Sequence, residues 1–133
     1  MLLAKNGHKV KLWVYKKDDY EAIVNERENR RYLPGTAIPD NVAVYHKLKE
    51  AVTDQDFILL AVPSHAVRET ARKIATHISS PPIIINAAKG FEDKTYKRLS
   101  QVIEEEIPEA RIVVLSGPSH AEEVAHRMPS SVV

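Results

Sequence analysis

Two short apolar runs, each followed by a loop of small residues, constrain the fold of this chain most. The first, IIINAAKG, occupies residues 83–90, and the second, IVVLSGPSHAEE, occupies residues 112–123. Each run stops at small residues and gives way to a helical pattern, which is typical of a parallel strand that enters a βα turn. Because ligands of open α/β sheets bind outside the carboxyl ends of the strands, we expect Lys89 and the turn at 116–119 to face one crevice.

The same alternation of strand and helix patterns runs through the rest of the chain. Strands are predicted at residues 10–14, 42–45 and 57–62, and the last run, FILLAV, is typical of a strand buried on both faces. Ser64 and Ser119 are predicted to cap the helices that follow them. Tyr96 and the apolar residues after it predict one face of a helix that ends at Pro108. Strict alternation predicts an α/β fold with a doubly wound parallel sheet.

The glycine-rich turn with which such sheets bind a nucleotide is missing from the sequence. That turn follows the pattern G-x-G-x-x-G, whereas the four glycines of this chain, at positions 7, 35, 90 and 117, are not spaced for it. Residues 2–4 resemble the last turn of an apolar helix, and Asn6-Gly7 supplies a left-handed stop. We therefore expect about 20–25 residues of a ~30-residue first βαβ unit, including the first strand, to lie upstream of Met1.

Composition argues against several classes of function. The 19 lysines and arginines nearly balance the 18 aspartates and glutamates, so no basic field favours nucleic acid. The absence of cysteine excludes disulfides and thiolate chemistry, and is compatible with a reducing cytoplasm. No apolar run approaches the ~20 residues that span a membrane. His120, Glu123 and His126 do not share one helix face, so no metal site is predicted.

Five motifs of the chain carry a family resemblance: AKNGHKVKLW, RYLPG, ILLAVPSHAVRE, AAKGFE and VLSGPSHAEEV. In this order and spacing they closely resemble the bacterial NAD(P)-dependent glycerol-3-phosphate dehydrogenases, over the whole chain. The resemblance implies that residues 1–133 are an incomplete NAD(P)-binding Rossmann domain, and that the helical substrate domain lies beyond Val133. It implies a cytoplasmic oxidoreductase that interconverts dihydroxyacetone phosphate and sn-glycerol 3-phosphate for glycerophospholipid synthesis, and it is compatible with a homodimer.

The resemblance assigns three residues to the substrate. Lys89 matches the lysine of the AKG motif, which in the family touches both substrate and cofactor, and we predict a catalytic role for it. An ammonium at a strand end suits that role, since it can polarise a ketone oxygen where negative charge develops. Gly117 and Ser119 match positions that line the substrate. A solvated lysine, and a tight turn into a capped helix, are the plainer interpretations of the same residues.

Three further residues match cofactor contacts besides Lys89. Tyr32 matches an aromatic contact, with ordinary loop packing as the alternative, and Ala121 matches a position where a small side chain leaves room. Tyr15 stands where many family members have arginine or histidine, at the strand end that reads the adenosine ribose. No acidic residue is there to hold a ribose 2′-hydroxyl, and Lys16 and Lys17 offer partners for a 2′-phosphate, so NAD and NADP both stay open.

Two other interpretations of the sequence stay open. One is another dehydrogenase of the β-hydroxyacid type, such as a ketopantoate reductase or a 6-phosphogluconate relative, although these lack the SGPS-x-A-E-E run. The other is a non-catalytic remnant or interaction module. In the family, the general acid or base is a lysine of the helical domain, beyond Val133. We therefore expect the 133-residue chain alone to be inactive.

Overall fold

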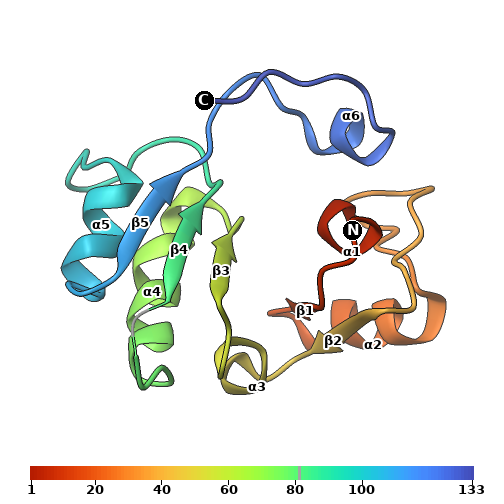
Figure 1. Cartoon of the computed structure of the whole chain (residues 1–133), viewed down its shortest axis with the longest axis horizontal. Coiled ribbons are helices and arrows are strands. Elements are labelled where there is room, and N and C mark those ends of the chain that lie inside the picture. Colours follow the sequence, from red (N-terminus) through yellow and green to blue (C-terminus); the bar gives the residue numbers. More distant parts are fainter. Residues whose placement is uncertain (81) are drawn as a thin grey trace. The chain divides into compact units, whose positions relative to one another are not determined.

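The computed structural model describes residues 1–80 and 82–133, along which short strands alternate with helices. All paired strands of the described part are parallel, which confirms the predicted α/β class (Figure 1). The elements are α1 (Leu2–Lys5), β1 (Val10–Trp13), α2 (Lys17–Glu26), β2 (Val42–Tyr45), α3 (Leu48–Val52), β3 (Phe57–Leu60), the 3₁₀ helix η1 (Ser64–Ala66), α4 (Val67–Ala75), β4 (Ile83–Asn86), α5 (Leu99–Glu106), β5 (Arg111–Val114) and α6 (Ala121–Ala125).

One compact unit comprises Met1–Ala51 and Pro118–Ser131. Its sheet has two strands, and β1 pairs with β2 so that Val10 lies opposite Val42 and Trp13 opposite Tyr45. The alternating apolar residues of β1 turn one face toward the core, as period-2 strands do. The core consists of Ala4, Ile23, Ile38 and Val42, with Met1, Val10, Leu12, Val14 and Val44 packed against it.

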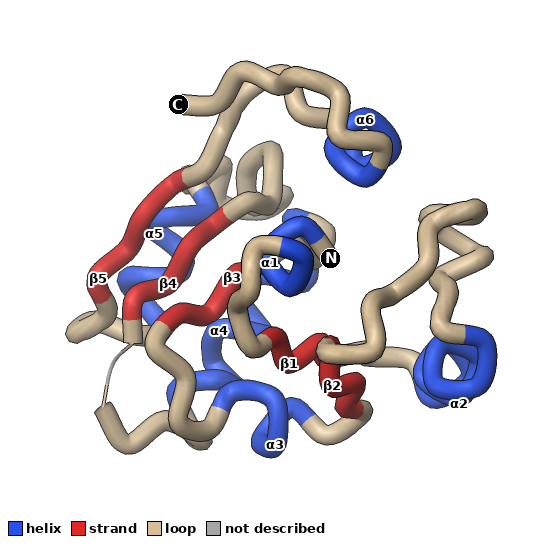
Figure 2. The backbone as a smooth tube through the Cα atoms, turned by 45° about the vertical axis from the view of Figure 1, so that its right-hand side comes forward, coloured by secondary structure: helices blue, strands red, loops and turns tan. Residues whose placement is uncertain are grey.

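The second compact unit comprises Val52–Gly117 and Val132–Val133. Its three strands follow the order β3-β4-β5, and Figure 2 shows them side by side. Helices α4 and α5 pack against each other and cover one face of this sheet. Their inward positions recur at helical spacing, as the sequence pattern predicted. The fully buried side chains of this core are Val67, Ile74, Ile84, Val102 and Ile103.

The prediction that both faces of the 57–62 strand are buried is wrong. Ile58 and Leu60 are buried, but Phe57 and Leu59 expose 58% and 46% of their surface. The reason is that successive side chains point to opposite faces, and the helices of this unit pack on only one of them. A continuous apolar run is compatible with burial of both faces of a strand. Whether both faces are buried depends on whether other elements pack against each of them.

Three helix starts also differ from the predicted ones. Helix α5 begins at Leu99, and Tyr96 lies before it in a loop, with a left-handed φ of 55° and 80% of its surface exposed. A 3₁₀ turn separates Ser64 from α4, whose N-cap is Ala66. The N-cap of α6 is His120, one residue after the predicted Ser119. In each case the helix was predicted to begin one to three positions early.

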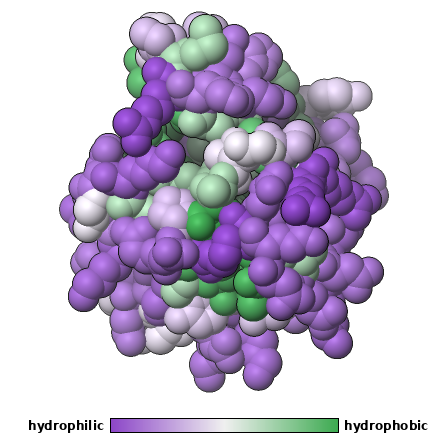
Figure 3. All heavy atoms as spheres, turned by 90° about the vertical axis from the view of Figure 1, so that its right-hand side faces the viewer, coloured by the Kyte–Doolittle hydropathy of each residue, from purple (hydrophilic) through white to green (hydrophobic). Residues whose placement is uncertain are grey.

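The face of the molecule drawn in Figure 3 is mostly polar. The face in Figure 3 carries hydrophobic residues in small, separate patches between charged ones. Within the described part, none of the helices has both the length and the apolar character that a membrane span requires.

Candidate functional site

The carboxyl ends of β4 and β5 bring Lys89 and Gly117 together. The two strands are parallel neighbours, with Asn86 opposite Val114, so the loops that leave them start at the same edge of the sheet. Lys89 and Gly117 each lie three residues beyond the end of their strand. The Lys89 Nζ donates a hydrogen bond to the carbonyl oxygen of Gly117 at 3.0 Å. The ammonium is therefore held over the end of β5 and stays accessible, since Lys89 is exposed.

Asn86 shapes the turn that carries Lys89, and the sequence reasoning missed it. It is the last residue of β4 and only 3% of its surface is exposed. Its side-chain oxygen accepts from the Ala88 N–H at 3.2 Å, and its Nδ2 donates to the Ala88 carbonyl at 3.3 Å. The N–H groups of Ala87 and Ala88 also bond the Leu60 carbonyl of β3, at 2.8 and 3.1 Å. A polar residue that ends an otherwise apolar strand was the available signal.

Replacing Asn86 by alanine should destabilise the protein by about 1–3 kcal/mol, because buried backbone groups of the turn lose their partners. The free energy of unfolding in urea measures this loss. The exposed Asn25 of α2 provides a matched control, whose alanine variant should stay within about 0.5 kcal/mol of the parent. Equal stability of the two variants would show that the Asn86 amide does not hold the turn.

Gly90 places the Lys89 turn close to the start of α4. Its φ is +102°, in the region that residues with a side chain rarely adopt. A Cβ built on Gly90 would lie 3.7 Å from the Cβ of Ser64, the first residue of η1. The AKG motif therefore ends in a glycine because the backbone needs this conformation where it passes Ser64.

A cluster of charged residues, called the ion-pair cluster below, lies beside this turn. Hydrogen bonds to the carboxylates of Glu92, Glu105 and Glu106 raise the pKa of the Arg68 guanidinium at its centre above its ordinary value, so Arg68 stays charged. The hydrogen bond from Arg68 is the main cause that lowers the pKa of Glu92, to about 2. The cluster consists of Arg68 and Arg72 of α4, Glu92 and Lys97 of the loop after β4, and Glu105 and Glu106 of α5.

The carboxylates of the ion-pair cluster should make stability depend on pH in the acid range. The pKa of Glu92 lies at about 2 in the folded protein against an ordinary value of 4.5. The pKa values of Glu105 and Glu106 are also lowered, chiefly by hydrogen bonds from Lys97 and Arg72. Because the folded-state values are depressed, the stabilisation is complete above pH 4.5 and is lost as the pH falls toward about 2.

Urea unfolding at several pH values between about 6 and 2 tests this expectation. The free energy of unfolding should fall with pH in the parent, and it should fall less steeply in Glu92→Gln, which has one titrating carboxylate fewer. Identical pH profiles for the two proteins would contradict the assignment of Glu92 to the cluster.

The other predicted site residues belong to the first unit. Tyr15 follows β1, exposes 68% of its surface and meets Trp13 edge to face at 5.9 Å between ring centroids. Tyr32 exposes 57% and lies under the Arg31 guanidinium at 5.3 Å. Ser119 is half-buried before α6, and Ala121 is the exposed first residue of α6.

The end of β1 fits the adenosine side of a dinucleotide in part. An exposed aromatic ring at Tyr15 can stack on a base, and Lys16 follows it directly. Lys17 is paired with Glu21 at 3.4 Å, so Lys16 is the better partner for a ribose hydroxyl or phosphate. The carboxylates that follow, Asp18 and Asp19, lie in the first turn of α2 and not at the strand end itself. The residues fit the ribose end of such a cofactor.

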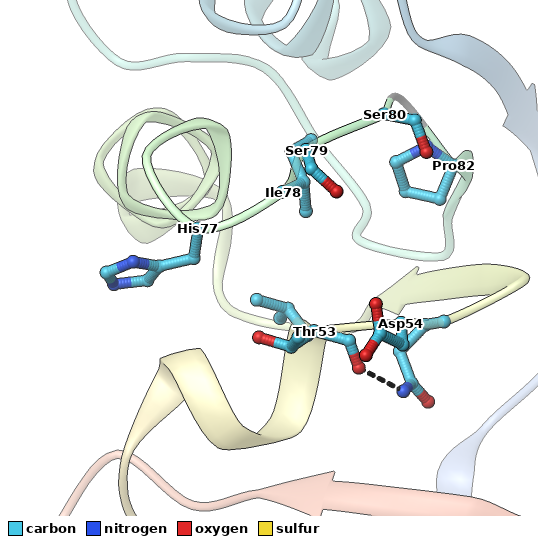
Figure 4. A pocket seen from close by; sticks show the side chains of 9 residues that line it. Thr53, Asp54, His77, Ile78, Ser79, Ser80 and Pro82 are labelled. Atoms are coloured by element: carbon cyan, nitrogen blue, oxygen red, sulfur yellow. Dashed lines mark hydrogen bonds between the residues drawn. The ribbon is translucent and has the colours of Figure 1, made fainter.

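A small cavity of about 50 Å³ lies at the opposite edge of the second unit's sheet. It is lined by residues 52–55, 77–80 and 82, which precede β3 and β4 rather than follow them. In Figure 4, the segment with Ser79, Ser80 and Pro82 lies above the one with Thr53 and Asp54. The dashed line marks the Gln55 side chain donating to the Thr53 carbonyl at 2.6 Å. This cavity is therefore remote from the Lys89 turn.

Comparisons with known proteins give one consistent family. Residues 1–133 match the family model described as NAD-dependent glycerol-3-phosphate dehydrogenase N-terminus. The glycerol-3-phosphate dehydrogenase [NAD(P)+] of Clostridium tetani is 44% identical over 133 residues, which are all of this chain and 38% of that relative. The enzyme of the same name from Clostridium acetobutylicum is 47% identical over 133 residues, 40% of its length.

Solved structures agree with the sequence relatives. The crystal structure of glycerol-3-phosphate dehydrogenase from Coxiella burnetii superimposes with a TM-score of 0.91 at 34% identity, and covers 98% of this chain and 40% of that one. The Plasmodium falciparum enzyme gives a TM-score of 0.85 at 26% identity. The chain thus spans about two fifths of the length of the relatives it matches.

Proposed function

The chain belongs to the NAD-dependent glycerol-3-phosphate dehydrogenase family, and we propose that it forms most of the cofactor-binding part of such an enzyme. The reaction would interconvert dihydroxyacetone phosphate and sn-glycerol 3-phosphate. When bound, NADH or NADPH supplies the hydride that reduces the ketone carbon. The residues of this chain would bind and orient the two reactants.

The observation that carries this proposal is the position of Lys89. Its ammonium lies at the carboxyl ends of two adjacent parallel strands, 3.0 Å from the Gly117 carbonyl oxygen. A fixed positive charge at this edge can stabilise the negative charge that develops on a ketone oxygen during reduction. Gly117 and Ser119 would line the substrate, and Tyr15, Tyr32, Lys89 and Ala121 would contact the cofactor.

We further propose that the 133 residues are an incomplete Rossmann domain within a longer enzyme. Two facts support this: the chain matches 38–40% of the length of its relatives, and its sequence has no G-x-G-x-x-G turn. The pyrophosphate cradle, the helical substrate domain and the family's acid-base lysine would then lie in other parts of that enzyme. A cytoplasmic location, a supply of glycerol phosphate for glycerophospholipid synthesis and a homodimer are part of the same proposal.

The test uses the 133-residue chain and a chimera. In the chimera, residues 1–133 replace the matching segment of the Clostridium tetani relative, which supplies the rest of a family-length chain. We expect the chimera to oxidise NADH or NADPH when dihydroxyacetone phosphate is added, and the 133-residue chain alone to show no such activity. A folded chimera without activity would count against the dehydrogenase and in favour of the non-catalytic interpretation.

A further inference from the structure

The turn that carries Lys89 continues into a loop, residues 91–98, that apolar burial does not anchor. Phe91 and Tyr96 expose 60% and 80% of their surface. Backbone hydrogen bonds close the loop on itself, from the Glu92 N–H to the Lys97 carbonyl at 3.0 Å and from the Tyr96 N–H to the Glu92 carbonyl at 2.9 Å. These bonds shape the loop but do not join it to α4, so its attachment to that helix has to come from side chains.

The carboxylate of Glu92 joins this loop to α4. Arg68 donates to it twice, from Nε to Oε1 at 2.5 Å and from Nη2 to Oε2 at 2.9 Å. Two parallel bonds fix the plane of the carboxylate as well as its distance, which a lysine cannot reproduce. The two side chains expose 27% and 15% of their surface, so water screens this pair less than a fully exposed one.

Arg68 is itself held in place by α5. Its Nη1 donates to Glu106 at 2.8 Å and its Nη2 donates to Glu105 at 2.8 Å. Arg72, one turn further along α4, binds the same Glu106 carboxylate through two bonds of 3.0 Å. Hydrogen bonds to α5 therefore hold the guanidinium that binds Glu92 in one orientation.

The 3₁₀ helix η1, which precedes α4, lies close to the Lys89 segment. A Cβ added to Gly90, next to Lys89, would lie 3.7 Å from the Cβ of Ser64, and Ser64 lies four residues before Arg68. Before Lys89, the Leu60 carbonyl and the Asn86 side chain hold Ala87 and Ala88. The backbone around Lys89 is thus held by the sheet before it and by the Arg68–Glu92 pair after it.

We propose that Arg68, acting through Glu92, is a positioning residue that holds the Lys89 ammonium at the carboxyl ends of β4 and β5. This inference rests on the proposed function of Lys89. It adds that the rate depends on an ion pair whose members touch neither reactant. It also explains the acidic residue of the AKGFE motif. Among the described residues, Glu92 is the only carboxylate of the loop that the structure shows hydrogen-bonded to Arg68.

Three variants separate positioning from a general effect on stability. Glu92→Gln keeps the size of the side chain and removes its charge, and Arg68→Lys keeps the charge but loses the two-pronged contact. Glu106→Gln is the matched control, because Glu106 binds Arg68 and Arg72 but does not belong to the loop. All three variants weaken the same ion-pair cluster, but only the first two break the contact between Arg68 and Glu92, since Glu105 still binds Arg68 when Glu106 is replaced. The Lys97–Glu105 pair, which ties the loop to α5, is kept in all three variants.

The first readout is amide hydrogen exchange in the 133-residue chain. We expect exchange at Glu92 and Tyr96, whose N–H groups are hydrogen-bonded within the loop that continues the Lys89 turn, to become at least about tenfold faster in Glu92→Gln and Arg68→Lys, and to change less than about twofold in Glu106→Gln. Equal acceleration in all three variants, or none in the first two, would overturn the inference.

The second readout is steady-state kinetics of the chimera with the same substitutions. The kcat should fall about ten- to hundredfold in Glu92→Gln and Arg68→Lys, because a displaced reacting group lowers the rate. The KM for the cofactor should change much less than kcat, since Lys89 is only one of its four proposed contacts. Unchanged kcat values in these variants would overturn the inference even if exchange accelerates. If the parent chimera has no activity, the proposed function fails, and the exchange experiment alone upholds or overturns the attachment of the Lys89 turn through Arg68.

Discussion

Replacing Lys89 by alanine should lower the kcat of the chimera at least about 100-fold, because the ketone oxygen loses a preorganised positive charge. Lys89 extends from a turn that Asn86 and Gly90 fix, so the protein pays no reorganisation cost when the charge acts. The measurement is the rate of NADH or NADPH oxidation at saturating dihydroxyacetone phosphate.

Lys94 is the matched control for this substitution. It is an exposed lysine of the same loop, five residues after Lys89, and its alanine variant should keep the parent's rate within about twofold. Full activity of Lys89→Ala, or an equal loss in Lys94→Ala, would contradict the role given to the AKG lysine.

Replacing Ile84 by alanine should destabilise the protein by about 2–5 kcal/mol, the usual cost of a cavity at a fully buried isoleucine. Ile84 is the second residue of β4 and has no exposed surface. It lies on the face of the sheet that α4 and α5 cover, so the space left behind cannot fill with solvent at low cost. Urea unfolding gives the free-energy difference.

Val113 on the neighbouring strand β5 is the control for the Ile84 substitution. It exposes 49% of its surface, so Val113→Ala should cost less than about 1 kcal/mol. Similar losses for the two variants would mean that the helices do not pack against the face that carries Ile84.

The positions of the strands and helices could be predicted from the sequence because apolar periodicity reports them directly. The runs at 83–90 and 112–123 contain β4 and β5, each followed by a loop. Lys89 lies next to Gly117 because the loops that leave neighbouring parallel strands start at the same edge of the sheet. The face on which Phe57 is exposed could not be predicted, since periodicity does not state where the covering helices end. Three helices begin one to three positions later than predicted, since the ends of a helix are its least sharply defined part.

The parts of the site that the sequence did not reveal depend on distant partners. Arg68 and Glu92 are 24 positions apart, and nothing in the order of residues states that α4 carries one beside the loop that carries the other. Asn86 left a local signal, a polar residue at the end of an apolar strand, but its burial and its bonds to Ala88 appear only in the structure. The motif residues were visible in the sequence, and the contacts that hold them were not.

The most direct test of the account is a crystal structure of the chimera with dihydroxyacetone phosphate and the oxidised cofactor. We expect the Lys89 Nζ to lie within about 3 Å of the ketone oxygen, with the substrate beside the backbone of Gly117 at the ends of β4 and β5. A substrate bound elsewhere in the enzyme, with the Lys89 side chain pointing into solvent, would contradict it.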